Sequence, residues 1–299
     1  MTAQDELFAG GAPSGRNGKK VVLIDGHALA YRSFYAIRDL STSGGRPVNA
    51  IYGFLRSLMR ILAEEGKGDA TVVAFDAPGA TFRHDQYEEY KATRAPTPDD
   101  LRPRITAIKE LVELLGLHRI EVPGLEADDL IGTIATNCES AGYDIEIVTN
   151  DRDAYQLVSE HVFVRGLDRN DRFGPEEVLE KYGVSVDQWT DYRALTGDAS
   201  DNIPGAKGIG PVAARKLLQQ YGSLDYILEN LDEVRPPGYA HKIRDSLAAV
   251  KFSRELSQIV TDADIEIDPQ RWSRREPDRE RLRDLLIDLE FNTILGSLR

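Results

Sequence analysis

Three short runs of β-branched and apolar residues in this chain each end in an aspartate. They are VVLID (residues 21–25), TVVAFD (residues 71–76) and IEIVTND (residues 145–151). Runs of this kind, separated by helical patterns, are typical of parallel strands that are buried on both faces of a sheet. In an open parallel sheet, ligands collect beyond the carboxyl ends of the strands. We therefore expect Asp25, Asp76 and Asp151 to meet at one edge.

A second source of acids is the segment EADDL, which contains Glu126, Asp128 and Asp129. It follows a further predicted strand at residues 119–122 and opens an apolar helical pattern. The helix dipole alone favours acids in a first turn, which leaves a purely structural role open for each acid taken singly. Three acids in four residues weaken that interpretation, and the topology would bring them to the same edge.

More acids occur where other predicted helices begin or end. Asp153 follows Asp151 at the start of a short helix, and Asp198 and Asp201 follow a helix that ends at a glycine. Clustered carboxylates repel one another, which raises their pKa values and destabilises the fold unless cations lie among them. Carboxylates are hard ligands and the five histidines are scattered, so the pattern favours Mg²⁺ or Mn²⁺ over Zn²⁺. Two such ions about 4 Å apart can hold a phosphodiester and activate water, leaving a 5′-phosphate and a 3′-hydroxyl.

The composition does not exclude a nucleic-acid partner. Domains that bind nucleic acids are usually basic, whereas this chain has a formal net charge of −13. The acids singled out here would account for most of that excess, and bound cations would neutralise them. The single cysteine, Cys138, is expected to be a buried thiol in a reducing compartment, and no apolar run approaches the ~18 residues of a membrane span. A cytoplasmic location, with no membrane partner, follows as the expectation.

The pattern divides the chain into three parts. Residues 1–19 are rich in Gly, Ser and Ala, lack the apolar stretch of a signal peptide, and are expected to be a disordered tail. Residues 20–185 read as an α/β core with a mostly parallel central sheet flanked by helices. Residues 186–299 read as a helical region, since strand patterns fade and amphipathic helices take over.

Two further segments suggest contacts with nucleic acid. In residues 78–98, cations alternate with aromatic rings, which suits a phosphate chain with exposed bases, although a solvated polar loop is the plain alternative. The cations and rings are Arg83, His84, Lys91, Arg94, Phe82, Tyr87 and Tyr90. The segment PGAKGIGP (residues 204–211) between two helices indicates a helix-hairpin-helix, whose glycines and free amides can approach a phosphate closely; an ordinary tight turn is the alternative.

Several motifs together are specific for one family. They are LIDGHALAYR, AFDAPGATFRH, YKATRAPTP, EADDLI, TNDRDAYQL, GDASDNIPGAKGIG and REPDRERLRDLL. On these motifs the chain, from about Lys20 onward, resembles the 5′ nuclease domains of bacterial DNA polymerases I, within the flap endonuclease family. The resemblance implies a PIN-like α/β fold with a helical, DNA-binding C-terminal region. It also implies removal of 5′ flaps and RNA primers by two-metal-ion catalysis in DNA replication and repair.

The resemblance also implies roles for particular residues. It places a first metal group at Asp25, Asp76, Glu126 and Asp128, with Asp129 beside them, and a second group at Asp151, Asp153, Asp198 and Asp201. Tyr90, Lys91 and Arg94 match the base of the family's helical arch, where cations meet the scissile phosphate. Gly205, Lys207, Gly208, Ile209 and Gly210 match the hairpin that grips duplex DNA and commonly holds K⁺. A monomer that is fused to, or acts with, a DNA polymerase at the nucleoid is the implied setting.

Two positions depart from the family pattern. Pro211 and Val212 stand where the family often places a charged residue and a lysine, so one phosphate contact is expected to be absent and duplex affinity lower. Arg152 replaces a lysine that is more common in the family, and because a cation is kept we expect little effect.

Two other functions remain as alternatives. One is a module that binds branched DNA without cutting it, although nine carboxylates near phosphates would weaken binding unless metals were present. The other is a haloacid dehalogenase-type phosphatase, suggested by the strand that ends in Asp25 and Gly26. That chemistry needs a second aspartate two residues after the nucleophile, where this chain has His27.

Overall fold

The computed structural model describes residues 18–64, 70–167 and 171–297, so the predicted disordered tail lies almost wholly outside the described residues. At its centre is a six-stranded sheet in the order β3-β2-β1-β4-β5-β6, in which every neighbouring pair is parallel except β5 and β6. The strands are β1 (Lys20–Asp25), β2 (Ala70–Ala74), β3 (His118–Ile120), β4 (Asp144–Val148), β5 (Val162–Arg165) and β6 (Arg172–Phe173). The predicted mostly parallel sheet is confirmed.

The ends of the strands determine where the predicted acids lie. Asp25 is the last residue of β1, whereas β2 ends at Ala74 and β4 ends at Val148, so Asp76 and Asp151 lie in the loops just beyond. The strand order reverses direction between β1 and β4, which is the switch point of a doubly wound sheet. The loops after β1, β2 and β4 therefore open around one crevice.

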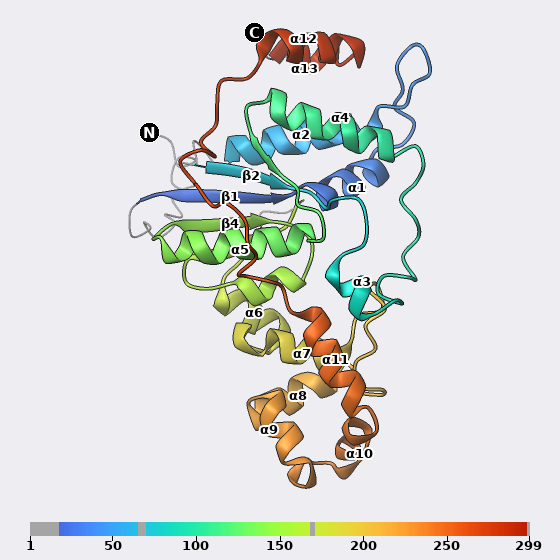
Figure 1. Cartoon of the computed structure of the whole chain (residues 1–299), viewed down its shortest axis with the longest axis vertical. Coiled ribbons are helices and arrows are strands. Elements are labelled where there is room, and N and C mark those ends of the chain that lie inside the picture. Colours follow the sequence, from blue (N-terminus) through green and yellow to red (C-terminus); the bar gives the residue numbers. More distant parts are fainter. Residues whose placement is uncertain (1–17, 65–69, 168–170, 298–299) are drawn as a thin grey trace, which may run out of the picture.

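Helices cover both faces of the sheet (Figure 1). One face, with Val22 and Ile24 of β1, packs against α1 (Gly26–Ala36), α2 (Asn49–Glu64) and α4 (Arg102–Leu114). The other face, with Val21 and Leu23, packs against α5 (Ala127–Ser140), where Cys138 is buried as predicted. Successive side chains of a strand point to opposite faces, so an uninterrupted apolar run is what a doubly covered strand requires.

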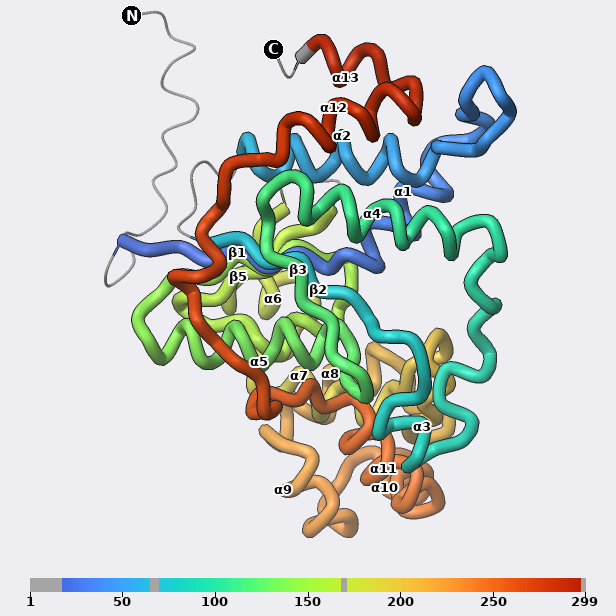
Figure 2. Tube along the Cα trace, turned by 45° about the horizontal axis from the view of Figure 1, so that its top comes forward, coloured from blue at the N-terminus to red at the C-terminus, as the bar shows by residue number. Residues whose placement is uncertain are grey.

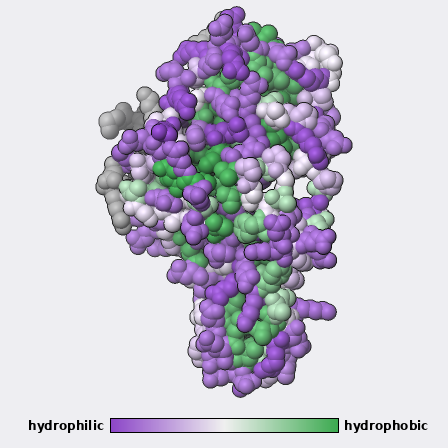
Figure 3. Space-filling model, in the orientation of Figure 1, coloured by the Kyte–Doolittle hydropathy of each residue, from purple (hydrophilic) through white to green (hydrophobic). Residues whose placement is uncertain are grey.

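A lobe of short helices extends the second face (Figure 1). Its hydrophobic core is continuous with that of the sheet, because Trp189, Leu217 and Ile243 belong to the same buried cluster as Val21. The elements are η1 (Asp153–Leu157), α6 (Pro175–Tyr182), η2 (Val186–Gln188), α7 (Trp189–Thr196), α8 (Pro211–Tyr221), α9 (Leu224–Glu229), η3 (Leu231–Glu233), α10 (Pro237–Asp245) and α11 (Leu247–Ser257). Hydrophilic residues dominate the face of the molecule seen in Figure 3. None of the described helices has the length and apolar composition to cross a membrane.

The end of the chain departs from the predicted division. Residues 186–299 were expected to form one helical region, but α12 (Arg279–Asp288) and α13 (Asn292–Ser297) return to the core and lie over α2 (Figure 2). A strap of residues 258–278 leads there along β3, with Arg275 N donating to Gly116 O at 3.0 Å. Gly116 has φ of +74°, and a Cβ there would lie 2.3 Å from Arg275 O. The last helices pack against α2 and α4 and belong to the core of this face.

One local prediction also needs correction. The segment between β2 and α4 contains a short helix, α3 (Phe82–Gln86), in which Arg83 is buried with 3 % of its surface exposed. Arg83 was expected to contact a phosphate chain, and its burial excludes that role. Its partners are described with the site.

Candidate active site

A cavity of about 900 Å³ lies at the carboxyl edge of the sheet. Among the residues that line it are four of the predicted acids, Asp25, Asp76, Asp128 and Asp151. We call these four the cavity acids. Two predicted cations, Lys91 and Arg94, line the same cavity. The structure therefore brings together residues that are up to 126 positions apart in the sequence.

Asp25 is held in the cavity wall by neutral donors. It caps the start of α1, accepting the Ala28 N–H at 2.8 Å, and its other oxygen accepts the hydroxyl of Thr149 at 2.9 Å. Burial, together with the negative charges of Asp76 and Asp151, raises the pKa of Asp25 to about 7. The carboxylate form of Asp25 is thus destabilised in the folded chain.

Asp76 is oriented by the start of α5 and by a histidine. Its Oδ1 accepts the Ala127 N–H at 2.7 Å, and its own backbone N–H donates to Nδ1 of His27 at 2.9 Å. Burial lowers the pKa of His27, and because Nδ1 acts as an acceptor the ring is neutral. The approach of Asp76 Oδ2 to the same nitrogen, at 3.4 Å, is therefore not an ion pair.

Asp128 and Asp151 complete the cavity acids. Burial and the charges of Asp151, Asp25 and Asp76 raise the pKa of Asp128 well above its ordinary value. Asp151 accepts the Asp153 N–H at 2.8 Å. Within the described part of the chain, none of the four cavity acids forms an ion pair with Lys or Arg. The charge of Lys91 and the hydrogen bonds to Asp25 therefore offset their mutual repulsion only in part.

The other five predicted acids are each in an ion pair. We call them the paired acids: Glu126, Asp129, Asp153, Asp198 and Asp201. None of them lines the cavity. Sequence reasoning treated all nine acids alike, whereas the structure separates them by the charge of their neighbours.

Glu126 connects the cavity edge to Tyr90 and Lys91. It is the N-cap residue of α5, and its carboxylate accepts from Lys91 Nζ at 2.8 Å and from the Tyr90 hydroxyl at 3.1 Å. Burial and the charges of Glu126 and Asp201 raise the pKa of Tyr90, so its hydroxyl stays protonated and donates. Burial opposes the charged form of Lys91, but Glu126 and Asp201 outweigh it and raise its pKa. Tyr90 is therefore a buried partner of Glu126 rather than a ring exposed to bases.

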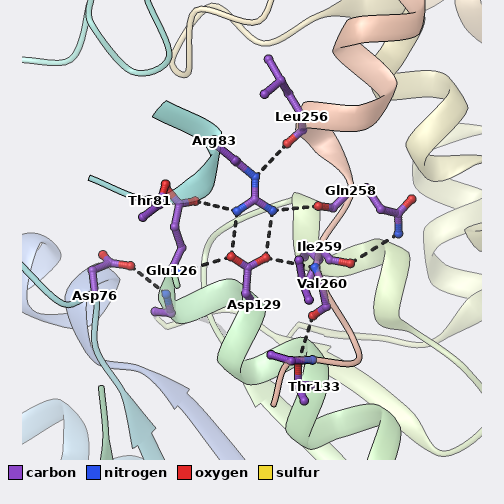
Figure 4. Close-up of polar contacts among 12 residues, drawn as sticks. Asp76, Thr81, Arg83, Glu126, Asp129, Thr133, Leu256, Gln258, Ile259 and Val260 are labelled. Atoms are coloured by element: carbon purple, nitrogen blue, oxygen red, sulfur yellow. Dashed lines mark hydrogen bonds and ion pairs between the residues drawn. The ribbon is translucent and has the colours of Figure 1, made fainter. Parts of the chain in front are cut away.

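Asp129 is not available to a metal ion, which corrects the prediction (Figure 4). Its side chain is fully buried, and both oxygens accept from the guanidinium of Arg83, at 2.7 and 2.8 Å. The same oxygens accept the N–H groups of Glu126, at 3.2 Å, and Val260, at 3.0 Å. These four donors use the hydrogen-bonding capacity of the carboxylate. It therefore holds α3, the start of α5 and the strap together and does not face the cavity.

Asp153 and Asp198 share one cation that the sequence analysis missed. Arg193, on α7, contacts Asp153 Oδ1 at 2.6 Å through Nε and contacts Asp198 through Nη2. Burial raises the pKa of Asp153 to about 7 although Arg193 opposes that shift. For Asp198 burial acts in the same direction, but hydrogen bonds from Ser200 and the charge of Arg193 prevail and lower its pKa. An ion bound between these acids would have to displace the guanidinium.

Asp201 contacts two of the predicted cations, Lys91 and Arg94. Its carboxylate pairs with Arg94, and its backbone oxygen accepts the Lys91 N–H at 2.9 Å. Lys91 has φ of +57°, a left-handed backbone conformation that is unfavourable for residues other than glycine. The contact with Asp201 helps to hold Lys91 in that conformation at the cavity.

The cavity has polar residues that sequence reasoning did not select. His27 lines it, and so do Arg102, Thr106 and Lys109 on α4. The signal for the α4 residues was present, since positions 102, 106 and 109 share one helix face. His27 follows the strand-ending Asp25 by two residues, and it had served only to exclude a phosphatase.

The hairpin lies outside the cavity, in the helical lobe. Gly205 and Gly208 have φ of +63° and +82°, and a Cβ on Gly205 would lie 2.4 Å from Gly197 N. Gly210 is the N-cap residue of α8, with open space around its missing side chain. Ile209 is buried, whereas Lys207 is exposed. A hairpin with an accessible helix start therefore lies between α7 and α8.

The cavity acids fit a hard divalent cation by their chemistry. They are carboxylates that form no ion pair with Lys or Arg among the described residues, and two of them have raised pKa values because of burial and one another. As the side chains lie, no group of three or more acidic, histidine or cysteine residues in the described ranges encloses a metal position. Coordination of a shared ion would therefore require the cavity acids to move closer together.

Comparison with protein families now identifies the class. The model for the 5′-3′ exonuclease N-terminal resolvase-like domain matches residues 20–183, and the model for the 5′-3′ exonuclease C-terminal SAM fold matches residues 184–280. The chain therefore belongs to the 5′-3′ exonuclease family. This confirms the resemblance that the motifs indicated.

Individual relatives agree with the family. The chain is 50% identical over 295 residues to "DNA polymerase I, thermostable" of Thermus thermophilus, covering 99% of this chain and 34% of that protein. It is 49% identical over 290 residues to DNA polymerase I of Deinococcus radiodurans, covering 96% of this chain and 30% of that protein. The chain thus spans about a third of the length of these relatives.

Solved structures show the same fold at lower identity. A T5 5′-exonuclease structure with bound zinc ions superposes with a TM-score of 0.70 at 20% identity, covering 81% of this chain and 90% of that one. The catalytic core of Rad2 in complex with DNA substrate superposes with a TM-score of 0.60 at 17% identity, covering 91% and 88%. At these identities the likeness establishes the fold alone.

Proposed function

We propose that this chain is a structure-specific 5′ nuclease, which hydrolyses phosphodiesters in 5′ flaps and at 5′ ends of DNA, and in RNA primers, during replication and repair. The observation that carries the proposal is the cavity in which four acids without cationic partners lie beside Lys91 and Arg94. Acids of this kind suit metal ions, and cations suit the phosphate that the metals hold. Family membership supports the same reaction.

The cofactor in this proposal is Mg²⁺ or Mn²⁺, with two or more ions. The cavity acids Asp25, Asp76, Asp128 and Asp151 would hold the first, and the paired acids Asp153, Asp198 and Asp201 would contribute where their arginines move aside. When bound, divalent ions supply the positive charge that polarises the phosphodiester and activates water. Glu126 would act mainly by holding Lys91.

The residues of the chain bind and orient the substrate around that charge. Lys91 stays protonated beside Glu126 and lies at the cavity wall, where it can meet a non-bridging phosphate oxygen. Arg94, held by Asp201, offers a second contact to the same strand. Positively charged donors placed where negative charge develops lower the barrier without reorganisation. Tyr90 keeps Glu126 oriented and does not react.

The hairpin is the proposed grip on duplex DNA. The open start of α8 at Gly210, with exposed Lys207 beside it, suits a phosphate and carries no sequence preference. K⁺ would bind here through backbone carbonyls. The Gly208 carbonyl already accepts Lys242 Nζ at 3.0 Å, so the chain supplies one cation itself and the ion would use other carbonyls.

The partners in this proposal are branched DNA and a polymerase. The curated relatives named DNA polymerase I are about three times as long as this chain, so we propose that it acts beside a polymerase domain or subunit, as a monomer at the nucleoid in the cytoplasm. The acidic net charge would be offset at the site by bound metal ions.

The test is a cleavage assay on a labelled 5′-flap duplex. We expect purified protein to cut near the junction with millimolar Mg²⁺ or Mn²⁺ and to be inactive with EDTA. A non-cleaving module for branched DNA would retain the flap duplex in a gel-shift assay and give no product with either metal. That outcome would overturn the proposal.

A further inference from the structure

The buried guanidinium of Arg83 joins three parts of the molecule (Figure 4). From α3, its Nε donates to Leu256 O at 3.1 Å and its Nη2 donates to Gln258 O at 2.7 Å. Its two terminal nitrogens also bind Asp129 of α5 at 2.7 and 2.8 Å. The Arg83 side chain thus joins α3, on which it lies, to the end of α11 and the start of α5.

Both charges of this pair lie at helix ends that favour them. The carbonyls of Leu256 and Gln258 terminate α11, where unsatisfied oxygens leave partial negative charge that suits Arg83. Asp129 is in the first turn of α5, where it accepts the Glu126 N–H at 3.2 Å and suits the partial positive charge. The pair therefore joins the end of one helix to the start of the other.

The same helix α11 also holds the hairpin. The hydroxyl of Ser253, which is fully buried, accepts the Gly205 N–H at 3.0 Å. The hydroxyl of Ser246, at the N-cap of α11, accepts the Lys207 N–H at 3.1 Å. These two hydrogen bonds tie the hairpin to the start of α11 and to a residue near its end. A shift of the hairpin would therefore act on α11.

The start of α5, which Asp129 joins to Arg83, contains residues of the candidate active site. Glu126 caps this helix and holds Lys91 Nζ at 2.8 Å, and Asp128 lies in its first turn and lines the cavity. Direct hydrogen bonds therefore run from the hairpin through α11, Arg83 and Asp129 to Glu126 and Lys91.

We propose that Arg83 and Asp129 are positioning residues that couple occupation of the hairpin by duplex DNA to the alignment of Glu126 and Lys91 at the cavity. This inference rests on the proposed nuclease function. Coupling means that bound duplex favours one arrangement of Arg83 and Asp129 over another. Its effect is therefore seen in the ratio of the cleavage rates of long-duplex and short-duplex substrates, and not as an equal change in both rates. A pair that only stabilised the fold would lower cleavage equally on every substrate.

The experiment measures single-turnover cleavage of 5′ flaps with downstream duplexes of about 4 to about 20 base pairs, about 14 to about 68 Å long at about 3.4 Å per pair. For the unmodified chain we expect the longest duplex to be cut at least about tenfold faster than the shortest, within the usual range of coupling. In the double variant Arg83→Met, Asp129→Leu, which removes both charges, we expect that ratio to fall below about twofold. The affinity for the longest duplex, measured in Ca²⁺ without cleavage, should change less than about threefold.

The matched control is Arg165→Met, which removes another buried guanidinium, one that pairs with Glu64 at 3.0 Å on the far strand β5. We expect this variant to keep the ratio of the unmodified chain. If circular dichroism shows that the double variant is unfolded, Ser253→Ala tests the same link at its hairpin end. It leaves every charge in place, and the ratio should again fall.

The outcomes separate the two proposals. If the unmodified chain cuts no substrate in Mg²⁺ or Mn²⁺, the nuclease proposal fails and the coupling fails with it. If it cuts flaps at a rate that does not depend on duplex length, only the coupling is overturned. The coupling is also overturned if the folded double variant, or Ser253→Ala in its place, keeps the full ratio or slows cleavage equally at every length.

Discussion

Asp128 and Asp129 are adjacent on the first turn of α5, yet their carboxylates have opposite surroundings. Asp128 lines the cavity, and its pKa is raised by burial and by the other cavity acids. Asp129 is saturated by Arg83 and two backbone N–H groups. The same contrast separates the four cavity acids from the five paired acids. The cavity acids lack such partners among the described residues, so the repulsion among them favours the binding of external cations.

The largest effect should follow from removing one cavity charge. We expect Asp128→Asn to lower single-turnover flap cleavage by about 10²- to 10³-fold, because one ligand of the proposed metal is weakened while the fold is kept. Binding of the uncut flap duplex in a gel-shift assay should change little. Full activity in this variant would remove Asp128 from the set of ligands.

The same substitution at the neighbouring residue should act on stability instead. We expect Asp129→Asn to lower the free energy of unfolding by about 3–5 kcal/mol, since it removes the carboxylate that binds both terminal nitrogens of Arg83 and leaves this buried guanidinium only the longer contact with Glu126, at 3.5 Å. Asp128→Asn, measured in EDTA at pH 8, should raise the stability because it removes repulsion. Urea titrations of both variants check this difference. Equal destabilisation by the two substitutions would erase the contrast between cavity and paired acids.

Divalent metal should stabilise the protein through the cavity acids. At a concentration about 100 times its dissociation constant, Mg²⁺ should add about 2.7 kcal/mol to the free energy of unfolding. Thermal melts with and without Mg²⁺ measure the gain, and in Asp25→Asn it should be smaller. A melting curve of the unmodified protein that does not respond to millimolar Mg²⁺ would contradict the role of the cavity.

The Asp25 carboxyl should also make the metal-free protein less stable as the pH rises. The pKa of Asp25 is about 7 in the fold against 3.8 ordinarily, so between these values the folded chain binds more protons than the unfolded chain. The free energy of unfolding should therefore fall with rising pH, by up to about 1.4 kcal/mol per unit for this group, and Asp153 acts in the same direction. The lowered pKa values of His27 and His118 act in the opposite direction, so the test is the difference in stability between the unmodified chain and Asp25→Asn in EDTA. This difference should fall as the pH rises from 5 to 7, and a difference that does not fall would contradict the assignment.

Local patterns were sufficient to predict much of the fold. The apolar runs that end in Asp25, Asp76 and Asp151 gave strands β1, β2 and β4 because a parallel strand covered on both faces leaves little choice of composition. The convergence of the acids followed from topology alone. The return of α12 and α13 onto α2 could not be foreseen, because their amphipathic pattern does not specify which surface they cover.

Local sequence patterns could not predict the division of the acids into cavity acids and paired acids. Asp128 and Asp129 are the same residue type in the same helical turn, so the sequence does not distinguish them. Adjacent residues on a helix point about 100° apart, and the two side chains therefore face different parts of the structure. The partner of Asp129 is 46 positions away and the cation shared by Asp153 and Asp198 is Arg193, on another helix. Charge pairing across such distances depends on packing, which composition and periodicity do not fix.

The cavity acids are expected to bind divalent cations that the fold does not supply, and a crystal structure of the protein soaked in Mn²⁺ tests this most directly. We expect anomalous density for Mn²⁺ inside the cavity, about 2.1 Å from carboxylate oxygens of Asp25, Asp76, Asp128 or Asp151. Asp129 should keep both contacts with Arg83. A cavity without Mn²⁺ at millimolar metal, or Mn²⁺ bound at Asp129 in place of Arg83, would contradict the central claim.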